Sequence, residues 1–256
     1  MSGKTLQSAL ITLGTLSALL FLPLTATGAG DQDFDLPDGS GHFYKQANGR
    51  GGQGELGFAI TNADGVPFWD EYRRLGGPDV LGYPISRRFI WDGFTVFATQ
   101  KAVLQWRPDT GAVTFANVLD RMHELGKDDW LLAFRQIPRP FDSSADIGLA
   151  WSEVVKRHLT FLEGNKYIKE RYLSNPAWLD HYGLPVSYDD FVSCYVVRGQ
   201  RAAFQYWKAD APWAKRGEIT IANAGELAKE AGLLPAEAVE PELPPRATRS
   251  ISGSTQ

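Results

Sequence analysis

The apolar residues between positions 67 and 116 follow first a helical and then a strand pattern. Phe68, Tyr72 and Leu75 recur at helical spacing, which predicts a helix over 67–75. Asp92-Gly93 lies between two short apolar runs and predicts a hairpin. The apolar runs predict four short strands, at 89–91, 94–98, 102–106 and 113–116.

A closing helix is predicted over 117–126. Asn117 is a suitable N-cap, Asp120 adds a carboxylate to the first turn, and Gly126 is typical of a helix end. The same start chemistry recurs at Asn223, which supports a second helix of the same kind.

The same order of motifs recurs about a hundred residues later in the chain. The segment LGYPISRRFIWDGFTVFATQKAVLQW at 81–106 is echoed by YGLPVSYDDFVSCYVVRGQRAAFQYW at 182–207. GAVTFANVLDRMHELG at 111–126 is echoed by GEITIANAGELAKEAG at 217–232. Matched blocks in one order indicate an internal duplication, which outweighs local signals in predicting a fold.

We therefore expect an α+β fold with two diverged internal repeats. Each repeat has a short helix, a small antiparallel β-sheet and a closing helix, and a long amphipathic helix over 145–162 bridges the two. The expected divisions are a signal peptide at 1–29, a flexible leader at 30–56, repeat one at 57–126, a helical connector at 127–165, repeat two at 166–235 and a disordered tail at 236–256. The leader is rich in Gly, Asp and Asn and the tail in Pro, Glu and Ser, compositions that favour disorder.

The N-terminal segment has the pattern of a secretory signal. Lys4 precedes a short apolar run at 10–24 and small residues at 26–29. The run is shorter than the ~20 apolar residues of a spanning helix, which favours cleavage and a secreted or cell-envelope-associated protein; an uncleaved anchor stays open. Cleavage would remove one of the 26 Lys and Arg and none of the 30 Asp and Glu, leaving a net charge of −5. This acidic balance argues against nucleic acid as a partner and gives no attraction to an anionic membrane.

Catalytic and metal-binding motifs are absent from the sequence. The four histidines have no metal-ligand spacing, and no HExxH, G-x-S-x-G or phosphate-loop pattern occurs. Cys194 is the only cysteine, so no internal disulfide forms, and its apolar surroundings favour a small buried residue. Asp128-Asp129 and Asp189-Asp190 are the visible carboxylate doublets, and their turn-like contexts favour solvated or capping roles. We expect no catalytic residue, no metal and no cofactor.

Glutamines in apolar strands are the most informative polar residues. Gln100 and Gln105 are echoed by Gln200 and Gln205. An unpaired buried amide costs roughly 1–3 kcal/mol, so each glutamine is expected to make either a structural hydrogen bond or a ligand contact. A neighbouring exposed tryptophan would add a stacking platform for a sugar. The candidate ligand-binding residues are Trp91, Gln105, Trp106, Arg107, Gln205, Tyr206 and Trp207.

Repeat one resembles an LGFP repeat. The resemblance rests on Trp69, Leu75-Gly76-Gly77, LGYPIS at 81–86, DGF at 92–94, LQWRPDTGAV at 104–113 and Leu125-Gly126. It covers about sixty residues well, and repeat two matches less well. The chain is also similar to a group of secreted bacterial proteins that share G-Y-P-I-S and Q-R-A-x-x-Q-x-W segments. The LGFP resemblance implies a secreted, envelope-associated repeat protein that anchors to the cell wall. The chain departs from that family in having two diverged copies, and Thr99-Gln100-Lys101-Ala102 stands where the family has a glycine pair.

Three functions stay open at this point. The first is a secreted non-catalytic binding module whose partner is cell-wall glycan or another envelope polymer. The second is a secreted cell-wall or polysaccharide hydrolase whose carboxylates are brought together by the fold. The third is an interaction or inhibitor module for another secreted protein. A groove lined by exposed aromatics favours the first, a cleft with two carboxylates the second, and a flat apolar patch the third.

Overall fold

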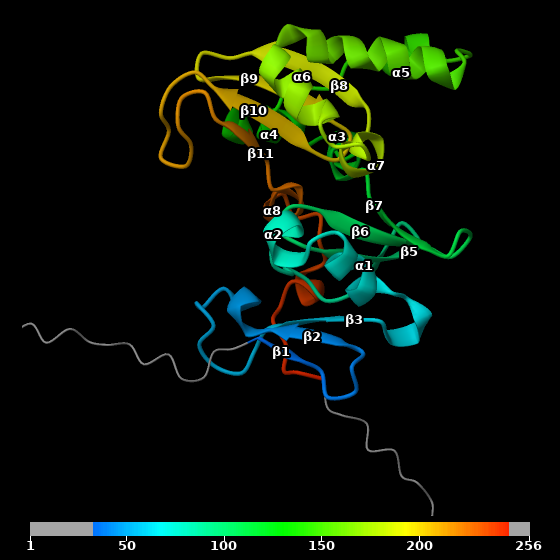
Figure 1. The fold of residues 1–256 in the computed structure, drawn as a ribbon, viewed down its shortest axis with the longest axis vertical. Helices are drawn as coiled ribbons and strands as arrows, with labels where there is room; N and C mark the ends of the chain where they lie inside the picture. Colours follow the sequence, from blue (N-terminus) through cyan, green and yellow to red (C-terminus); the bar gives the residue numbers. More distant parts are fainter. Residues whose placement is uncertain (1–32, 246–256) are drawn as a thin grey trace, which may run out of the picture. The chain divides into compact units, whose positions relative to one another are not determined.

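The computed structural model describes residues 33–245, and the predicted signal peptide lies outside these residues (Figure 1). The described chain is a mixed α+β fold with eight α-helices and three small antiparallel sheets. Among residues 33–245, no helix combines the length and apolar character needed to cross a bilayer.

The first sheet corrects the prediction of a flexible leader at 30–56. It consists of β1 (Phe34–Asp35), β2 (Gly41–Tyr44) and β3 (Phe58–Thr61), in the order β1-β2-β3. Phe43 is fully buried, and Asn48 donates side-chain hydrogen bonds to the carbonyls of Gln53 and Leu56, at 2.9 and 3.1 Å. The composition of this segment favours disorder, but side-chain-to-backbone hydrogen bonds hold its glycine-rich loop. Such bonds produce no periodic pattern of apolar residues, so the sequence pattern did not indicate them.

The described part of the predicted disordered tail is also ordered. Glu242 pairs with Gly57 through two backbone hydrogen bonds of 2.8 Å, and Arg87 donates its backbone N–H to the carbonyl of Ala238 at 2.7 Å. Backbone hydrogen bonds to distant segments therefore order the chain at least as far as Glu242, and residues 246–256 lie outside the described range.

Two four-stranded sheets follow, each preceded by a pair of short helices and followed by one helix. The first set is α1 (Phe68–Arg74), α2 (Gly77–Leu81), β4 (Phe89–Trp91), β5 (Phe94–Ala98), β6 (Val103–Arg107), β7 (Ala112–Phe115) and α3 (Val118–Glu124). The second set is α6 (Lys166–Leu173), α7 (Trp178–Tyr182), β8 (Pro185–Asp190), β9 (Cys194–Gly199), β10 (Ala203–Trp207), β11 (Ile219–Ile221) and α8 (Ala224–Glu230). Both sheets are antiparallel with strands in sequence order.

The helix that follows each sheet binds to the other sheet. The backbone N–H of Leu119 on α3 donates to the carbonyl of Gln200 after β9, at 3.0 Å. The backbone N–H of Glu226 on α8 donates to the carbonyl of Gln100 after β5, also at 3.0 Å. Neighbouring Gly225 approaches the first sheet so closely that a Cβ there would lie 1.8 Å from the carbonyl oxygen of Thr99. Reciprocal contacts of α3 and α8 therefore join the two halves of the chain.

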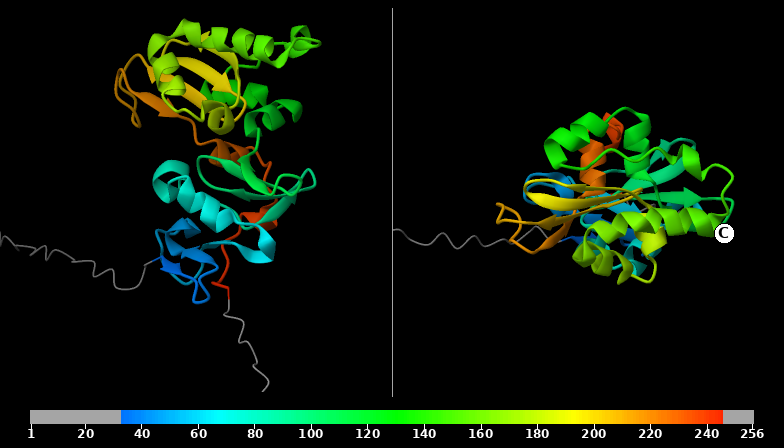
Figure 2. Two further views of the ribbon diagram at one scale, coloured as in Figure 1. Left: turned by 45° about the vertical axis from the view of Figure 1, so that its right-hand side comes forward. Right: turned by 90° about the horizontal axis from the view of Figure 1, so that it is seen from above.

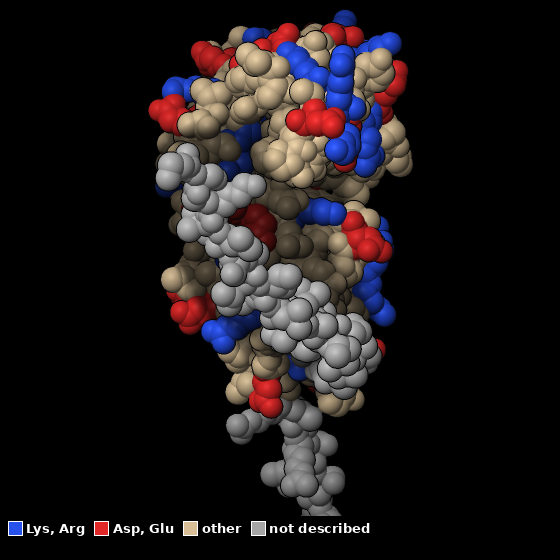
Figure 3. All heavy atoms as spheres, turned by 90° about the vertical axis from the view of Figure 1, so that its left-hand side faces the viewer, with Lys and Arg blue, Asp and Glu red and all other residues tan. Residues whose placement is uncertain are grey.

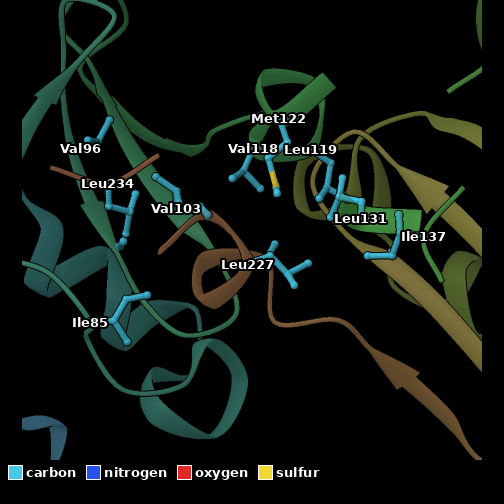
Figure 4. Close-up of a cluster of buried hydrophobic side chains, with 14 residues drawn as sticks. Ile85, Val96, Val103, Val118, Leu119, Met122, Leu131, Ile137, Leu227 and Leu234 are labelled. Atoms are coloured by element: carbon cyan, nitrogen blue, oxygen red, sulfur yellow. The ribbon is translucent and has the colours of Figure 1, made fainter. Parts of the chain in front are cut away.

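A shared hydrophobic core lies around these two helices (Figure 4). Val96 and Val103 come from the first sheet, Met122 from α3, and Leu227 from α8. Leu131 of α4 (Asp128–Arg135) completes this core and is fully buried. The core draws on elements far apart in the sequence, so neither sheet buries its inner face alone.

The predicted bridging helix over 145–162 is wrong in length and in role. The α5 helix spans only Trp151–Leu159 and is followed by a 3-10 turn at Thr160–Gly164. It packs against β8 of the second sheet. In Figure 2, α5 and α6 lie together on one face of the second sheet. Gly148, with a φ of 84°, interrupts the helical pattern before Trp151, and α3, α4 and α8 join the halves instead.

Candidate functional site

The echoed glutamines Gln105 and Gln205 lie on corresponding strands, β6 and β10, and each lines a cavity. We call the cavity at Gln205 the aromatic groove and the cavity at Gln105 the acidic cavity. These two surface cavities differ in chemistry, which decides what each can bind.

The aromatic groove lies between the end of α4 and the connection from β10 to β11. It has a volume of about 540 Å³ and is lined by residues 133–136, Ser193, Gln205, Trp207 and residues 210–213. Phe134 and Trp213 are 65% and 68% exposed. Two large aromatic side chains therefore stand exposed at one concave site, an arrangement that favours ligand binding.

Hydrogen bonds from the second sheet hold the α4 side of the groove. Gln205 donates from Nε2 to the carbonyl of Arg135 at 2.8 Å. The next residue, Gln136, adopts a left-handed conformation with φ 53°, and its side-chain oxygen accepts hydrogen bonds from Ser193 and from the thiol of Cys194. Backbone strain of this kind persists only where surrounding contacts impose it, and it concentrates at functional sites.

The opposite side of the groove depends on Trp207. Its indole N–H donates to the hydroxyl of Thr220 at 2.9 Å, and its ring meets Trp213 edge-on, with centroids 5.7 Å apart. Trp207 is buried while Trp213 projects into solvent. The buried ring thus supports the exposed one on this side of the groove.

The acidic cavity lies between the first sheet and α3. Its volume is about 230 Å³, and its lining includes Trp91, Gln105, Asp120, Arg121 and Glu124. Burial raises the pKa of Asp120 to about 6, although a hydrogen bond from Gln200 opposes the change. Asp120 and Glu124 are one helical turn apart, so their carboxylates share a face of α3. The cavity can therefore hold a proton on one carboxyl at mildly acidic pH.

A third cavity lies on the other face of β10. Tyr206 lines it together with Tyr167 and Tyr195. Successive residues of a strand point to opposite faces, which separates Tyr206 from its neighbour Gln205. We call this site the tyrosine cavity.

The seven predicted site residues are distributed among several places and do not form one site. Trp91 and Gln105 line the acidic cavity, Gln205 and Trp207 the aromatic groove, and Tyr206 and Trp207 the tyrosine cavity. Trp106 packs against the core under α1. Arg107 pairs with Asp109 and lies over the ring of Phe94, 5.5 Å from its centroid.

Phe134, Gln136 and Trp213 are groove residues that the sequence analysis missed. Phe134 and Gln136 lie in the connector and Trp213 in the β10–β11 connection, outside the blocks that the two halves share. A tryptophan beside Pro212 in a polar loop was the one available signal. Trp213 has no counterpart in the first half, so the duplication did not indicate it.

Three of the four residues in the carboxylate doublets make ion pairs, with Asp190 contacting Lys208. Asp128 contacts Arg198 and His123, and Asp129 contacts Arg139. Within residues 33–245, no group of three or more His, Cys, Asp and Glu side chains is placed to hold a metal ion.

No protein-family model matches this chain, and a search of functionally described proteins returns no match. The resemblance to LGFP repeats therefore remains a prediction, and the functional argument rests on the cavities.

Proposed function

We propose that this chain is an exported, non-catalytic binding module that holds a glycan of the cell envelope in the aromatic groove. The observation that carries the proposal is that two exposed aromatic side chains, Phe134 and Trp213, line one concave site. Aromatic faces stack on the apolar faces of sugar rings, while nearby amides and charges bond their hydroxyls. The volume of about 540 Å³ lies within the range of small-ligand sites.

The polar groups of the groove suit a neutral, hydroxyl-rich ligand. Gln205 and Gln136 each use one end of the side-chain amide within the protein, and Asp210 adds an acceptor at the rim. Figure 3 shows positive and negative side chains interspersed on one face of the molecule. This mixture gives no support to non-specific binding of a polyanion there.

We further propose that the two halves are diverged copies of one scaffold. Tyr72 donates its hydroxyl proton to the carbonyl of Gly82 at 2.8 Å, and Tyr172 donates to Gly183 at 2.7 Å. Gly82 and Gly183 both have a φ of 74°. These matched contacts support an ancestral unit whose two cavities, at Gln105 and Gln205, later acquired different linings.

The test is retention of the mature chain on purified peptidoglycan and on insoluble polysaccharides, with soluble products assayed in parallel. We expect retention without product release, and we expect Trp213→Ala and Phe134→Ala to weaken retention about tenfold each. Trp151→Ala is the matched control because Trp151 is 60% exposed on α5 and lines none of the three cavities. Equal retention of Trp213→Ala and Trp151→Ala would reject the groove as the site.

A hydrolase is the second candidate, and the acidic cavity favours it. A carboxyl of raised pKa beside a second carboxylate is the pairing that glycoside hydrolysis uses, and Asp120 and Glu124 supply both groups. Soluble fragments that appear with the wild-type chain and vanish with Asp120→Asn would replace the binding proposal with this one.

A further inference from the structure

A strip of tyrosines crosses the second sheet at one end of the face that α6 covers. Tyr167 of α6 stacks on Tyr206 of β10, with ring centroids 5.0 Å apart and 8° between the planes. Tyr195 of β9 lies 6.0 Å from Tyr206, and Tyr188 of β8 lies 6.5 Å from Tyr195. The rings thus form a continuous aromatic surface across three strands.

The tyrosine cavity beside this strip contains three cationic side chains and no carboxylate. Its volume is about 380 Å³, and its charged lining residues are Lys166, Lys208 and Arg216. Within residues 33–245, the side chains of Lys166 and Arg216 make no ion pair, whereas Lys208 contacts Asp190 outside the cavity lining. In a chain of net charge −4, this local excess of positive charge indicates an anionic ligand.

The aromatic rings and the cations are already in contact without a ligand. The ammonium of Lys208 lies 4.2 Å from the ring centroid of Tyr195, and that of Lys166 lies 4.9 Å from the ring centroid of Tyr167. These cation–π contacts hold the amines beside the aromatic surface. An acidic group between the amines would therefore place the rest of its molecule against the tyrosine rings.

The tyrosine hydroxyls at the cavity are available to a ligand. Within the part of the chain that the structure describes, the hydroxyls of Tyr167, Tyr195 and Tyr206 have no hydrogen-bond partner. By contrast, the core hydroxyls of Tyr72 and Tyr172 donate to backbone carbonyls. Free phenol groups beside an aromatic surface can donate to the hydroxyls of a sugar.

We infer that the tyrosine cavity binds an anionic sugar unit, with its ring against Tyr167 and Tyr206 and its carboxylate or phosphate among Lys166, Lys208 and Arg216. Stacking selects the sugar ring, and the three cations, of which Lys166 and Arg216 make no ion pair within residues 33–245, select the acidic group. Trp207 lines both cavities, but none of the tyrosines and cations that carry this inference lines the aromatic groove. The inference therefore does not rest on the proposed function.

The test is a chemical-shift titration of the mature chain with methyl glucuronide and methyl glucoside, which differ in the carboxylate. We expect the glucuronide to bind about tenfold more tightly, and added salt to reduce that difference. Glucose 6-phosphate and inorganic phosphate form the second pair of probes. Glucose 6-phosphate should bind more tightly than inorganic phosphate, because only the sugar stacks on the tyrosines.

Substitutions of exposed side chains test ligand binding at the cavity without removing residues of the core. Lys166→Gln should weaken glucuronide binding about tenfold and leave glucoside binding unchanged. Lys169→Gln is the matched control, because Lys169 lies on the same helix, pairs with Glu163 and is absent from the cavity lining. Tyr167→Ala should weaken both sugars, since Tyr167 is 45% exposed and contributes the outer ring.

Three results would overturn the inference. They are equal affinity for the two methyl glycosides, equal loss from Lys166→Gln and Lys169→Gln, and affinity for inorganic phosphate equal to that for glucose 6-phosphate. Trp213→Ala should leave glucuronide binding intact, and Tyr167→Ala should leave retention on insoluble polymer intact. Failure of either proposal is thereby distinguished from failure of the other.

Discussion

The guanidinium of Arg198 on β9 donates from Nη1 to the Oδ1 atom of Asp128 on α4, at 2.8 Å, with the arginine side chain fully buried. The same guanidinium donates to the carbonyls of Pro138 and Leu119, at 2.9 and 2.6 Å. Burial acts to raise the pKa of Asp128, but hydrogen bonds from His123 and Arg198 outweigh it, so the pKa lies below its ordinary value. One buried cation therefore ties the second sheet to α3, the helix that follows the first sheet.

Arg198→Met is expected to destabilise the chain by roughly 3–5 kcal/mol, because it leaves Asp128 and two carbonyls without their buried donor. Urea unfolding of both proteins measures the difference. Arg139→Met is the control, since Arg139 is 61% exposed and pairs with exposed Asp129; it should cost no more than about 1 kcal/mol. Similar losses from the two variants would contradict a special role for the buried arginine.

Local signals predicted the first four-stranded sheet well. The hairpin at Asp92-Gly93 is confirmed, with φ values of 50° and 83° that suit a tight turn. The helix expected over 67–75 is confirmed as α1. Both features depend on residues close in sequence, whose spacing records the geometry directly.

The sequence did not predict contacts between segments that are far apart in the chain. Asn117 was expected to cap α3, but its side-chain oxygen accepts a hydrogen bond from Arg201 of the second sheet, at 2.6 Å. The exchange of α3 and α8 between sheets follows from backbone bonds that no local pattern encodes. Trp213 and Phe134 meet at one groove only after the second sheet and α4 pack together. The prediction of a structural hydrogen bond is confirmed for Gln100, whose side-chain oxygen accepts from the backbone N–H of Tyr83.

Gly82 is predicted to resist substitution because of its backbone and its neighbour. Its φ is 74°, and a Cβ would lie 2.8 Å from the Cβ of Gln100, whose side-chain oxygen accepts from the N–H of Tyr83. Gly82→Ala should cost about 2–4 kcal/mol by combining backbone strain with a lost hydrogen bond. Gly93→Ala has a similar φ of 83° in open space and should cost about 1–2 kcal/mol. Chemical unfolding of both variants compares the two, and an equal cost would show that Gln100 simply moves aside.

Asp120 is predicted to make stability depend on pH. Burial is the main reason that its pKa rises from the ordinary value of 3.8 to about 6 in the folded chain. The folded state therefore holds this proton more tightly than the unfolded state. The resulting stabilisation is complete below the unfolded pKa and is lost as the pH rises through the folded pKa.

Asp120→Asn should therefore gain stability relative to wild type as the pH rises from about 4 to above 7. With allowance for partial exposure, the gain is about 1–2 kcal/mol. Asp142→Asn is the control, because hydrogen bonds from Ser144 lower the pKa of exposed Asp142. Asp142 therefore stays ionised in the folded chain across this pH range, and the profile of Asp142→Asn should run nearly parallel to that of wild type. Unfolding curves across this pH range measure both, and parallel profiles for wild type and Asp120→Asn would refute the assignment.

Cys194 is predicted to be unreactive in the folded chain. Its side chain is fully buried, and burial raises the pKa of its thiol, so little thiolate is present at neutral pH. Labelling with a maleimide should be slow in buffer and fast in urea, and its urea dependence should follow global unfolding. Fast labelling in buffer would mean that β9 opens locally beside the aromatic groove.

Substitution of the echoed glutamines Gln105 and Gln205 by leucine is predicted to have different effects in the two halves of the chain. Gln205→Leu removes the donor to the carbonyl of Arg135 that fixes the end of α4. It should cost about 1–3 kcal/mol and weaken retention on polymer, since Phe134 is carried by that helix. Gln105→Leu changes a residue that lines the acidic cavity and not the aromatic groove, so retention should not change. Chemical unfolding and retention on polymer are measured for both variants. If Gln205→Leu is retained as well as Gln105→Leu, the end of α4 is held without Gln205 and the groove does not depend on it.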